Sequence, residues 1–163
     1  AVKLSLRAEG LSGFEQADAL AEMKAVKVSA KTPGLVIGAD QMLILEDAVF
    51  DKPDGLEGAR AHLLALRGKT HTLATACVIA DAGRPIWRVM TLPKLTMRNF
   101  SDAFLDAYLE QVGEAVCSSV GAYQLEGLGA QLFSRIEGDY FSILGLPLLE
   151  LLDFLRTRGI AQR

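Results

Sequence analysis

Two charged residues stand out because their neighbours in the sequence limit how far they can move. Asp40 ends the apolar run of residues 35–39, which is typical of a buried strand, and Lys52 is followed directly by Pro53. A carboxylate at the end of a buried strand is held rigidly beside a core, where it suits a general base or a metal ligand. The proline restricts the backbone at Lys52. We therefore expect an acid and a base to face one cleft.

The first half of the chain contains the elements that would position these residues. Apolar side chains that recur at helical or alternating spacing, with turn residues between them, predict helices and strands in order. Asp40 is expected between two of the strands. The predicted elements are a helix over 14–30 capped by Ser12, a strand over 35–39, a hairpin over 42–50 that turns at 46–47, and a helix over 55–67 stopped by Gly68.

The second half alternates helices and strands in the same way. Three glycines in residues 120–130 surround polar side chains, a composition that lets the backbone approach a ligand closely. The other predicted elements are antiparallel strands over 71–80 and 86–98, a helix from Ser101 to about 112, a strand over 131–136 and a terminal helix through Leu155. This order predicts an α/β domain on a mixed sheet.

Composition limits the classes of protein to consider. The chain has 163 residues, 50% of them hydrophobic, which suffices for one core, so residues 1–163 are expected to form a single domain. A net charge of −3 and a pI near 5.4 give no basic surface for nucleic acid or an anionic membrane. No apolar stretch reaches the roughly 18 residues of a membrane span, and no cationic-then-apolar leader opens the chain. We expect a soluble, cytoplasmic protein that binds neither nucleic acid nor membrane.

A series of motifs resembles the Maf family of nucleoside triphosphate pyrophosphatases, also called septum formation proteins. Each motif alone is weak, but their shared order and spacing along most of the chain are far more specific. Arg67 stands where the family usually has serine. The motifs are Leu20-Ala21-Glu22-Met23-Lys24-Ala25, Val36-Ile37-Gly38-Ala39-Asp40, Lys52-Pro53, Gly68-Lys69-Thr70-His71, Gly121-Ala122-Tyr123, Glu126-Gly127, Ile136-Glu137-Gly138-Asp139-Tyr140 and Gly145-Leu146-Pro147-Leu148.

The resemblance implies a reaction and a set of site residues. The family hydrolyses nucleoside triphosphates between the α and β phosphates, giving a monophosphate and pyrophosphate with a divalent cation. Asp40 is then the catalytic base, a ligand of Mg²⁺ or Mn²⁺, or both, while Lys24 and Lys52 hold the triphosphate. This agrees with the chemistry, because attack on a negatively charged phosphorus needs cations at the phosphate oxygens and a carboxylate beside the water.

Two residues indicate which base is bound. By resemblance, members that act on dTTP and UTP carry threonine after the aspartate and glutamine in the glycine-rich loop, whereas those that act on 7-methyl-GTP carry glutamine and glutamate. This chain has Gln41 and Glu126. A glutamate accepts hydrogen bonds from the guanine ring and its amine, and it favours the cationic methylated ring. The resemblance therefore predicts 7-methyl-GTP bound by Gln41 and Glu126, with dTTP, UTP or CTP as the alternative.

The implied fold is an elongated mixed β-sheet with flanking helices in two lobes around a central cleft, similar to inosine triphosphate pyrophosphatases. Dimers are common in the family, so a homodimer is expected. The family also opens with a Ser-x-Ser-Pro-Arg-Arg phosphate loop and a Val-Asp-Glu segment, and neither pattern occurs in this sequence. We therefore expect residues 1–163 to be one Maf-like domain without its first strand and phosphate loop.

Structural roles compete with these assignments. Taken alone, Asp40 would more often be a turn carboxylate, and Lys24 and Lys52 solvated surface charges. His71 is expected to be structural or exposed, and Trp87 to pack within a strand. The alternative from another functional class is a nucleotide-binding regulator of septum formation with little turnover.

Overall fold

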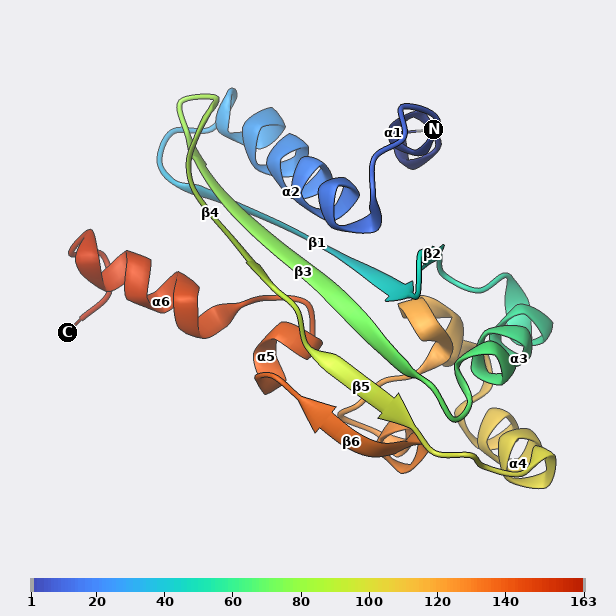
Figure 1. Cartoon of the computed structure of the whole chain (residues 1–163). Coiled ribbons are helices and arrows are strands. Elements are labelled where there is room, and N and C mark those ends of the chain that lie inside the picture. The colour runs from blue at the N-terminus through green and yellow to red at the C-terminus, as the bar shows by residue number, and fades with distance from the viewer. Residues whose placement is uncertain (1, 163) are drawn as a thin grey trace. The chain divides into compact units, whose positions relative to one another are not determined.

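The computed structural model describes residues 2–162, which form an α/β structure of helices and one open sheet (Figure 1). The helices are α1 (Val2–Ala8), α2 (Gly13–Ser29), α3 (Gly55–Leu66), α4 (Asp102–Val112), α5 (Tyr140–Ile143) and α6 (Leu148–Thr157), with short 3-10 segments η1 (Gly113–Ser118), η2 (Val120–Ala122) and η3 (Leu128–Leu132). The strands are β1 (Val36–Leu45), β2 (Ala48–Phe50), β3 (Thr70–Asp81), β4 (Arg84–Thr91), β5 (Lys94–Met97) and β6 (Phe133–Glu137). None of the helices within residues 2–162 combines the length and apolarity needed to cross a bilayer.

The sheet confirms the predicted fold class. Its strands run in the order β2-β1-β3-β5-β6, and β4 also pairs with β3. The pairings β1–β2, β3–β4, β3–β5 and β5–β6 are all antiparallel.

The strand predicted over residues 86–98 is two strands. Residues 84–91 of β4 pair with β3 from Asp81 back to Thr75, whereas β5 pairs with β3 at residues 70–72. Leu92 and Pro93 separate β4 from β5. A proline has no N–H to donate to a ladder, which explains why the strand is interrupted at this point.

The chain divides into two compact units, each built from separate stretches of sequence. The first unit comprises the chain up to Gln41, Ala74–Pro93 and the chain from Gly138, and the second comprises Met42–Leu73 and Lys94–Glu137. Each unit is described below by itself.

In the first unit, α2 packs unusually close to β1. Ser12 caps the helix as predicted, because its side chain accepts from the Glu15 backbone while the Glu15 carboxylate accepts from the Ser12 N–H at 2.8 Å. Gly38 makes the close approach feasible, since a Cβ at this position would lie 2.3 Å from the Ala21 carbonyl oxygen and 2.6 Å from the Ala25 nitrogen. The absence of a side chain at Gly38 therefore sets where α2 lies on the strand.

Helix α6 covers a second apolar cluster of the first unit. Cys77, Ile79 and Leu151 are buried together, and Trp87 stacks on Phe154 with ring centroids 5.0 Å apart. The prediction that Trp87 serves strand packing is confirmed.

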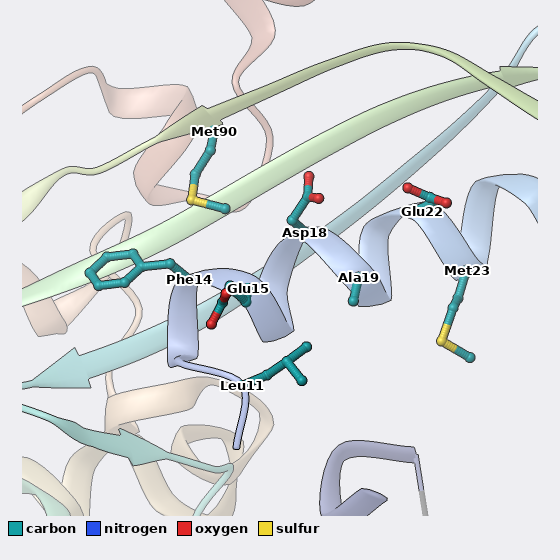
Figure 2. Close-up of a pocket in the computed structure, with 8 residues that line it drawn as sticks. All are labelled: Leu11, Phe14, Glu15, Asp18, Ala19, Glu22, Met23 and Met90. Carbon is teal, nitrogen blue, oxygen red and sulfur yellow. The ribbon is translucent and has the colours of Figure 1, made fainter. Parts of the chain in front are cut away.

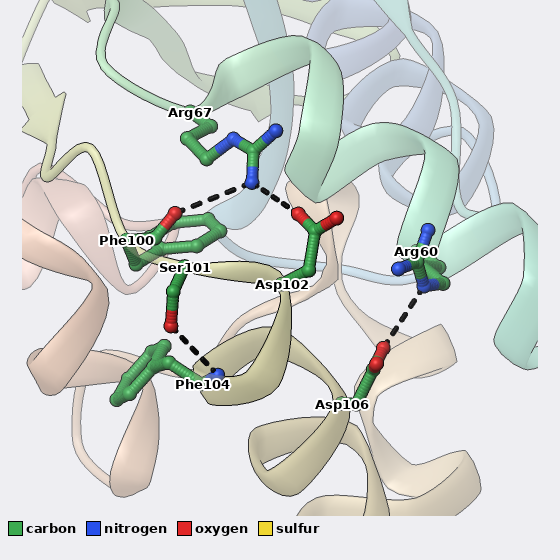
Figure 3. Close-up of polar contacts among 7 residues, drawn as sticks. All are labelled: Arg60, Arg67, Phe100, Ser101, Asp102, Phe104 and Asp106. Carbon is green, nitrogen blue, oxygen red and sulfur yellow. Dashed lines mark hydrogen bonds and ion pairs between the residues drawn. The ribbon is translucent and has the colours of Figure 1, made fainter.

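In the second unit, α3 and α4 are joined by two ion pairs (Figure 3). Arg67 bonds to Asp102 and to the Phe100 carbonyl, and Arg60 bonds to Asp106 at 3.0 Å. Ser101 caps α4 as predicted, accepting from the Phe104 N–H at 3.1 Å. Arg67, which replaces the serine usual in the resembling motif, therefore has a structural role at the start of α4.

Candidate active site

Asp40 lies inside a strand and not between two strands. The prediction of separate strands on either side of it is wrong, because β1 is continuous from Val36 to Leu45. The carboxylate at 40 and the amide at 41 do not interrupt the ladder. Since successive side chains of a strand point to opposite faces, Asp40 and Gln41 face opposite sides of the sheet.

The structure brings Lys24 and Asp40 together. The Lys24 ammonium donates to Asp40 Oδ1 at 2.6 Å and to the Ala39 carbonyl at 2.8 Å. The Asp40 side chain is only 10% exposed, whereas that of Lys24 is 55% exposed. The close packing of α2 at Gly38 carries Lys24 to this position, so a cation and a nearly buried carboxylate lie at one point of the first unit.

The other Asp40 oxygen, Oδ2, is buried and has no hydrogen-bond partner among the described residues. A buried carboxylate oxygen without a partner is unusual and is often explained by a catalytic role or by a ligand. Within residues 2–162 no three His, Cys, Asp or Glu side chains gather as a metal site would require. Mg²⁺ commonly takes only one or two protein carboxylates and completes its shell with phosphates and water, so Asp40 alone fits that type of site.

Gln41 is held on the opposite face by three acceptors. Its Nε2 donates to Thr75 Oγ1 at 2.7 Å, to the Ser142 carbonyl at 2.9 Å and to the Ile143 carbonyl at 3.2 Å. Thr75 itself donates to the Ser142 carbonyl at 2.9 Å. The roles of Thr75 and Ser142 were not predicted, although a threonine inside the apolar run Leu73–Ala80 was a visible signal.

Lys52 and Glu126 belong to the second unit, and both side chains are exposed. Lys52 precedes the buried Pro53 on the segment between β2 and α3. Glu126 lies in the turn between η2 and η3, where a Cβ at Gly129 would lie 2.4 Å from the Gln124 carbonyl oxygen. The glycine-rich loop is therefore tightly turned, and the roles of Lys52 and Glu126 in substrate binding stay predictions.

His71 is a structural residue of the second unit. It is buried, and its Nε2 shares a hydrogen bond of 2.8 Å with the Tyr123 hydroxyl. Burial lowers the pKa of His71 from 6.5 to about 4. The same burial raises the pKa of Tyr123 well above its ordinary range. The histidine is thus neutral in the folded protein near neutral pH.

The His71 environment predicts lower stability in acid. Between pH 6.5 and pH 4 the unfolded chain binds a proton that the folded chain does not, so the stabilisation present above pH 6.5 is lost as the pH falls. We expect the free energy of unfolding to fall by about 3 kcal/mol across this window. Urea titrations between about pH 7.5 and pH 4.5 measure the effect. His71→Gln should flatten the dependence while His62→Gln keeps most of it, and an unchanged slope in His71→Gln would contradict the assignment.

A hollow of the first unit does not contain the predicted site residues. It measures about 510 Å³ and is lined by residues of α2, by Leu11 and by Met90 from β4 (Figure 2). Its acidic residues are already engaged, since Asp18 and Glu22 bond to Arg88 and Glu15 to Ser12. The residues that line it are Leu11, Phe14, Glu15, Asp18, Ala19, Glu22, Met23 and Met90.

The chain is similar in sequence to known proteins over most of its length. A family model described as Maf-like protein matches residues 5–158. A nucleoside triphosphate pyrophosphatase of Hyphomonas neptunium is 62% identical over 96% of this chain and 79% of its own length, and one of Caulobacter vibrioides is 60% identical over 98% and 80%. A 7-methyl-GTP pyrophosphatase of Mesorhizobium japonicum is 51% identical over 98% of this chain and 80% of its own length.

Proposed function

Because the chain belongs to the Maf family, we propose that it is a nucleoside triphosphate pyrophosphatase whose reaction is carried by the Lys24 and Asp40 pair. Relatives with 62%, 60% and 53% identity bear that enzyme name, which supports the reaction class. The single observation that carries the residue assignment is the pairing of Lys24 with a nearly buried carboxylate whose second oxygen is unpartnered.

In the proposed reaction, water attacks the α-phosphorus of the triphosphate. The bond from that phosphorus to the bridging oxygen breaks, pyrophosphate leaves, and the nucleoside monophosphate carries the new oxygen. Asp40 orients the water and accepts its proton through the free Oδ2. Lys24 uses two of its three N–H donors on Asp40 and Ala39, which leaves one for a phosphate oxygen.

Lys52 supplies a second cation for the triphosphate, a role that rests on the resemblance of its Lys-Pro pair. A divalent cation, Mg²⁺ or Mn²⁺, would be held by Asp40 together with the phosphates, and it would neutralise the charge that develops on the leaving pyrophosphate. The Asp40 carboxylate would still set where the water stands relative to Lys24.

We propose 7-methyl-GTP as the substrate, and Glu126 as the residue that selects it. The exposed carboxylate suits the N–H donors and the positive charge of the methylated guanine, and the Mesorhizobium japonicum relative is named for this substrate. dTTP, UTP or CTP is the alternative within the same reaction. A nucleotide-binding regulator with little turnover is the alternative of another class.

The test is pyrophosphate release by the intact protein from a panel of nucleoside triphosphates with Mg²⁺ or Mn²⁺. We expect 7-methyl-GTP to give the highest kcat/KM, and Glu126→Gln to lower that value about tenfold relative to UTP because a charged acceptor is lost. Glu114→Gln, another exposed glutamate of the second unit, is the matched control. A higher kcat/KM for UTP or dTTP would favour the alternative substrates, and bound nucleotide without pyrophosphate release would favour the regulator.

A further inference from the structure

The side chain of Gln41 forms a set of hydrogen bonds next to Asp40. Its amide nitrogen bonds to one side chain and two main-chain carbonyls, and the three acceptors come from β3 and α5. Thr75 closes the set by donating to the same Ser142 carbonyl. Gln41, Thr75 and Ser142 all belong to the first unit, and they form a polar cluster that we term the Gln41 clamp.

The clamp adds hydrogen bonds at the end of a short helix. Helix α5 has only four residues, and the residues that follow it satisfy several of its carbonyls, the Ser142 carbonyl accepting from the Gly145 N–H at 3.1 Å. The carbonyls of Ser142 and Ile143 also accept from the Gln41 amide. Asp139 caps the other end by accepting from the Ser142 N–H at 2.9 Å. The short helix is therefore fastened to β1 at one residue, and that residue adjoins Asp40.

Asp40 is thus held from both sides of its strand. Lys24 bonds to its carboxylate and to the Ala39 carbonyl on one face, while the clamp fixes the next residue on the other face. Main-chain rotation at Asp40 would have to break one set of bonds or the other. Reacting groups must be held within a fraction of an ångström, so such a restraint affects the rate directly.

We propose that Gln41 is a positioning residue that, together with Thr75, fixes the main chain at Asp40. The catalytic part of this proposal rests on the proposed function. The amide nitrogen of Gln41 is engaged by Thr75, Ser142 and Ile143, so any contact with a base would use the Gln41 Oε1. The positioning role is carried by the nitrogen and does not depend on such a contact.

Kinetics with several nucleotides test this proposal. Gln41→Met removes the donor at nearly constant volume, and Thr75→Val removes the hydroxyl at constant shape. For both variants we expect kcat to fall about tenfold with KM nearly unchanged, because Asp40 is misplaced while substrate binding is kept. In Thr75→Val the ratio of kcat/KM for 7-methyl-GTP to that for UTP should stay the same, because Asp40 acts alike on every nucleotide. Thr75→Ser keeps the hydroxyl and should restore the rate.

Thr91→Val is the matched control. Thr91 lies opposite Thr75 in the β3–β4 ladder, and its buried hydroxyl has no hydrogen-bond partner among the described residues. The same change of side chain should therefore leave kcat unaltered. Equal losses of kcat in Thr75→Val and Thr91→Val would overturn the proposal, because general loss of packing would then explain both.

Hydrogen exchange of main-chain amides tests the Gln41 clamp without relying on the proposed reaction. In Gln41→Met and Thr75→Val, the amide protons of residues 143–146 and of β1 near Asp40 should exchange about tenfold faster, and in Thr91→Val they should not. This result supports the clamp even if the wild-type protein releases no pyrophosphate, an outcome that would sink the proposed function alone. Unchanged exchange in both Gln41→Met and Thr75→Val would overturn the proposal.

Discussion

Asp40→Asn is expected to lower kcat/KM for nucleoside triphosphate hydrolysis by about 10²–10⁴-fold, the usual contribution of a general base. Asparagine keeps the shape of the side chain and can still accept from Lys24, so the chain should fold. It cannot take a proton from water, and its amide nitrogen would stand where the unpartnered Oδ2 lies now. Nucleotide binding should persist or tighten, because a negative charge near the phosphates is lost.

The measurement is pyrophosphate release together with nucleotide affinity by calorimetry. Asp81→Asn is the matched control, since Asp81 is an exposed aspartate at the end of β3 in the same unit. It should keep full activity. A fall of less than threefold in Asp40→Asn would show that Asp40 is not the general base of the reaction.

Gly38→Ala is expected to give the largest loss of stability, about 3 kcal/mol, because the new Cβ would clash with the main chain of α2. The nearest atoms are the Ala21 carbonyl oxygen at 2.3 Å and the Ala25 nitrogen at 2.6 Å, and neither can move without the helix. Helix α2 would have to shift outward and take Lys24 with it. Activity should therefore fall even at temperatures where the variant remains folded, and urea titration with an activity assay measures both effects.

Gly58→Ala is the matched control, and its expected effect has the opposite sign. Gly58 lies inside α3, and a Cβ there would meet Pro53 at 3.5 Å, an ordinary contact. Alanine favours a helix over glycine by about 0.5–1 kcal/mol, so this variant should be slightly more stable. If Gly38→Ala were as stable as the wild type, the close packing of α2 on β1 would not describe the protein.

Local signals in the sequence were sufficient to predict helices α2, α3 and α4. Ser12 and Glu15 form a capping box, Ser101 caps α4, and Gly68 follows α3, each as the residue types predicted. The hairpin of β1 and β2 also follows from its alternation and turn residues. These elements were predictable because their causes lie within a few residues of each other.

The features that the sequence did not predict depend on contacts between residues that lie far apart in the sequence. The polar partners of Asp40 and Gln41 inside β1 are Lys24 and Thr75, which lie 16 and 34 residues away from them in the sequence. Helix α5 is too short to show a helical period, and the side chain that donates to its Ser142 carbonyl lies 101 residues earlier. The meeting of Lys24 with Asp40 needed the close approach at Gly38, which no spacing rule contains. The family resemblance placed both residues in one site, but neither the resemblance nor the pattern predicted their ion pair.

The separation of Gln41 from Ser142 also bears on how the protein is made. Their bond spans 101 residues, so β1 emerges from the ribosome long before its partner in α5 is synthesised. Contacts of such long range form late and slow the folding of a domain. Until α5 has left the ribosome, the Asp40 segment would therefore lack the hydrogen bonds between Gln41 and that helix. A nascent chain stopped before residue 138 should be inactive.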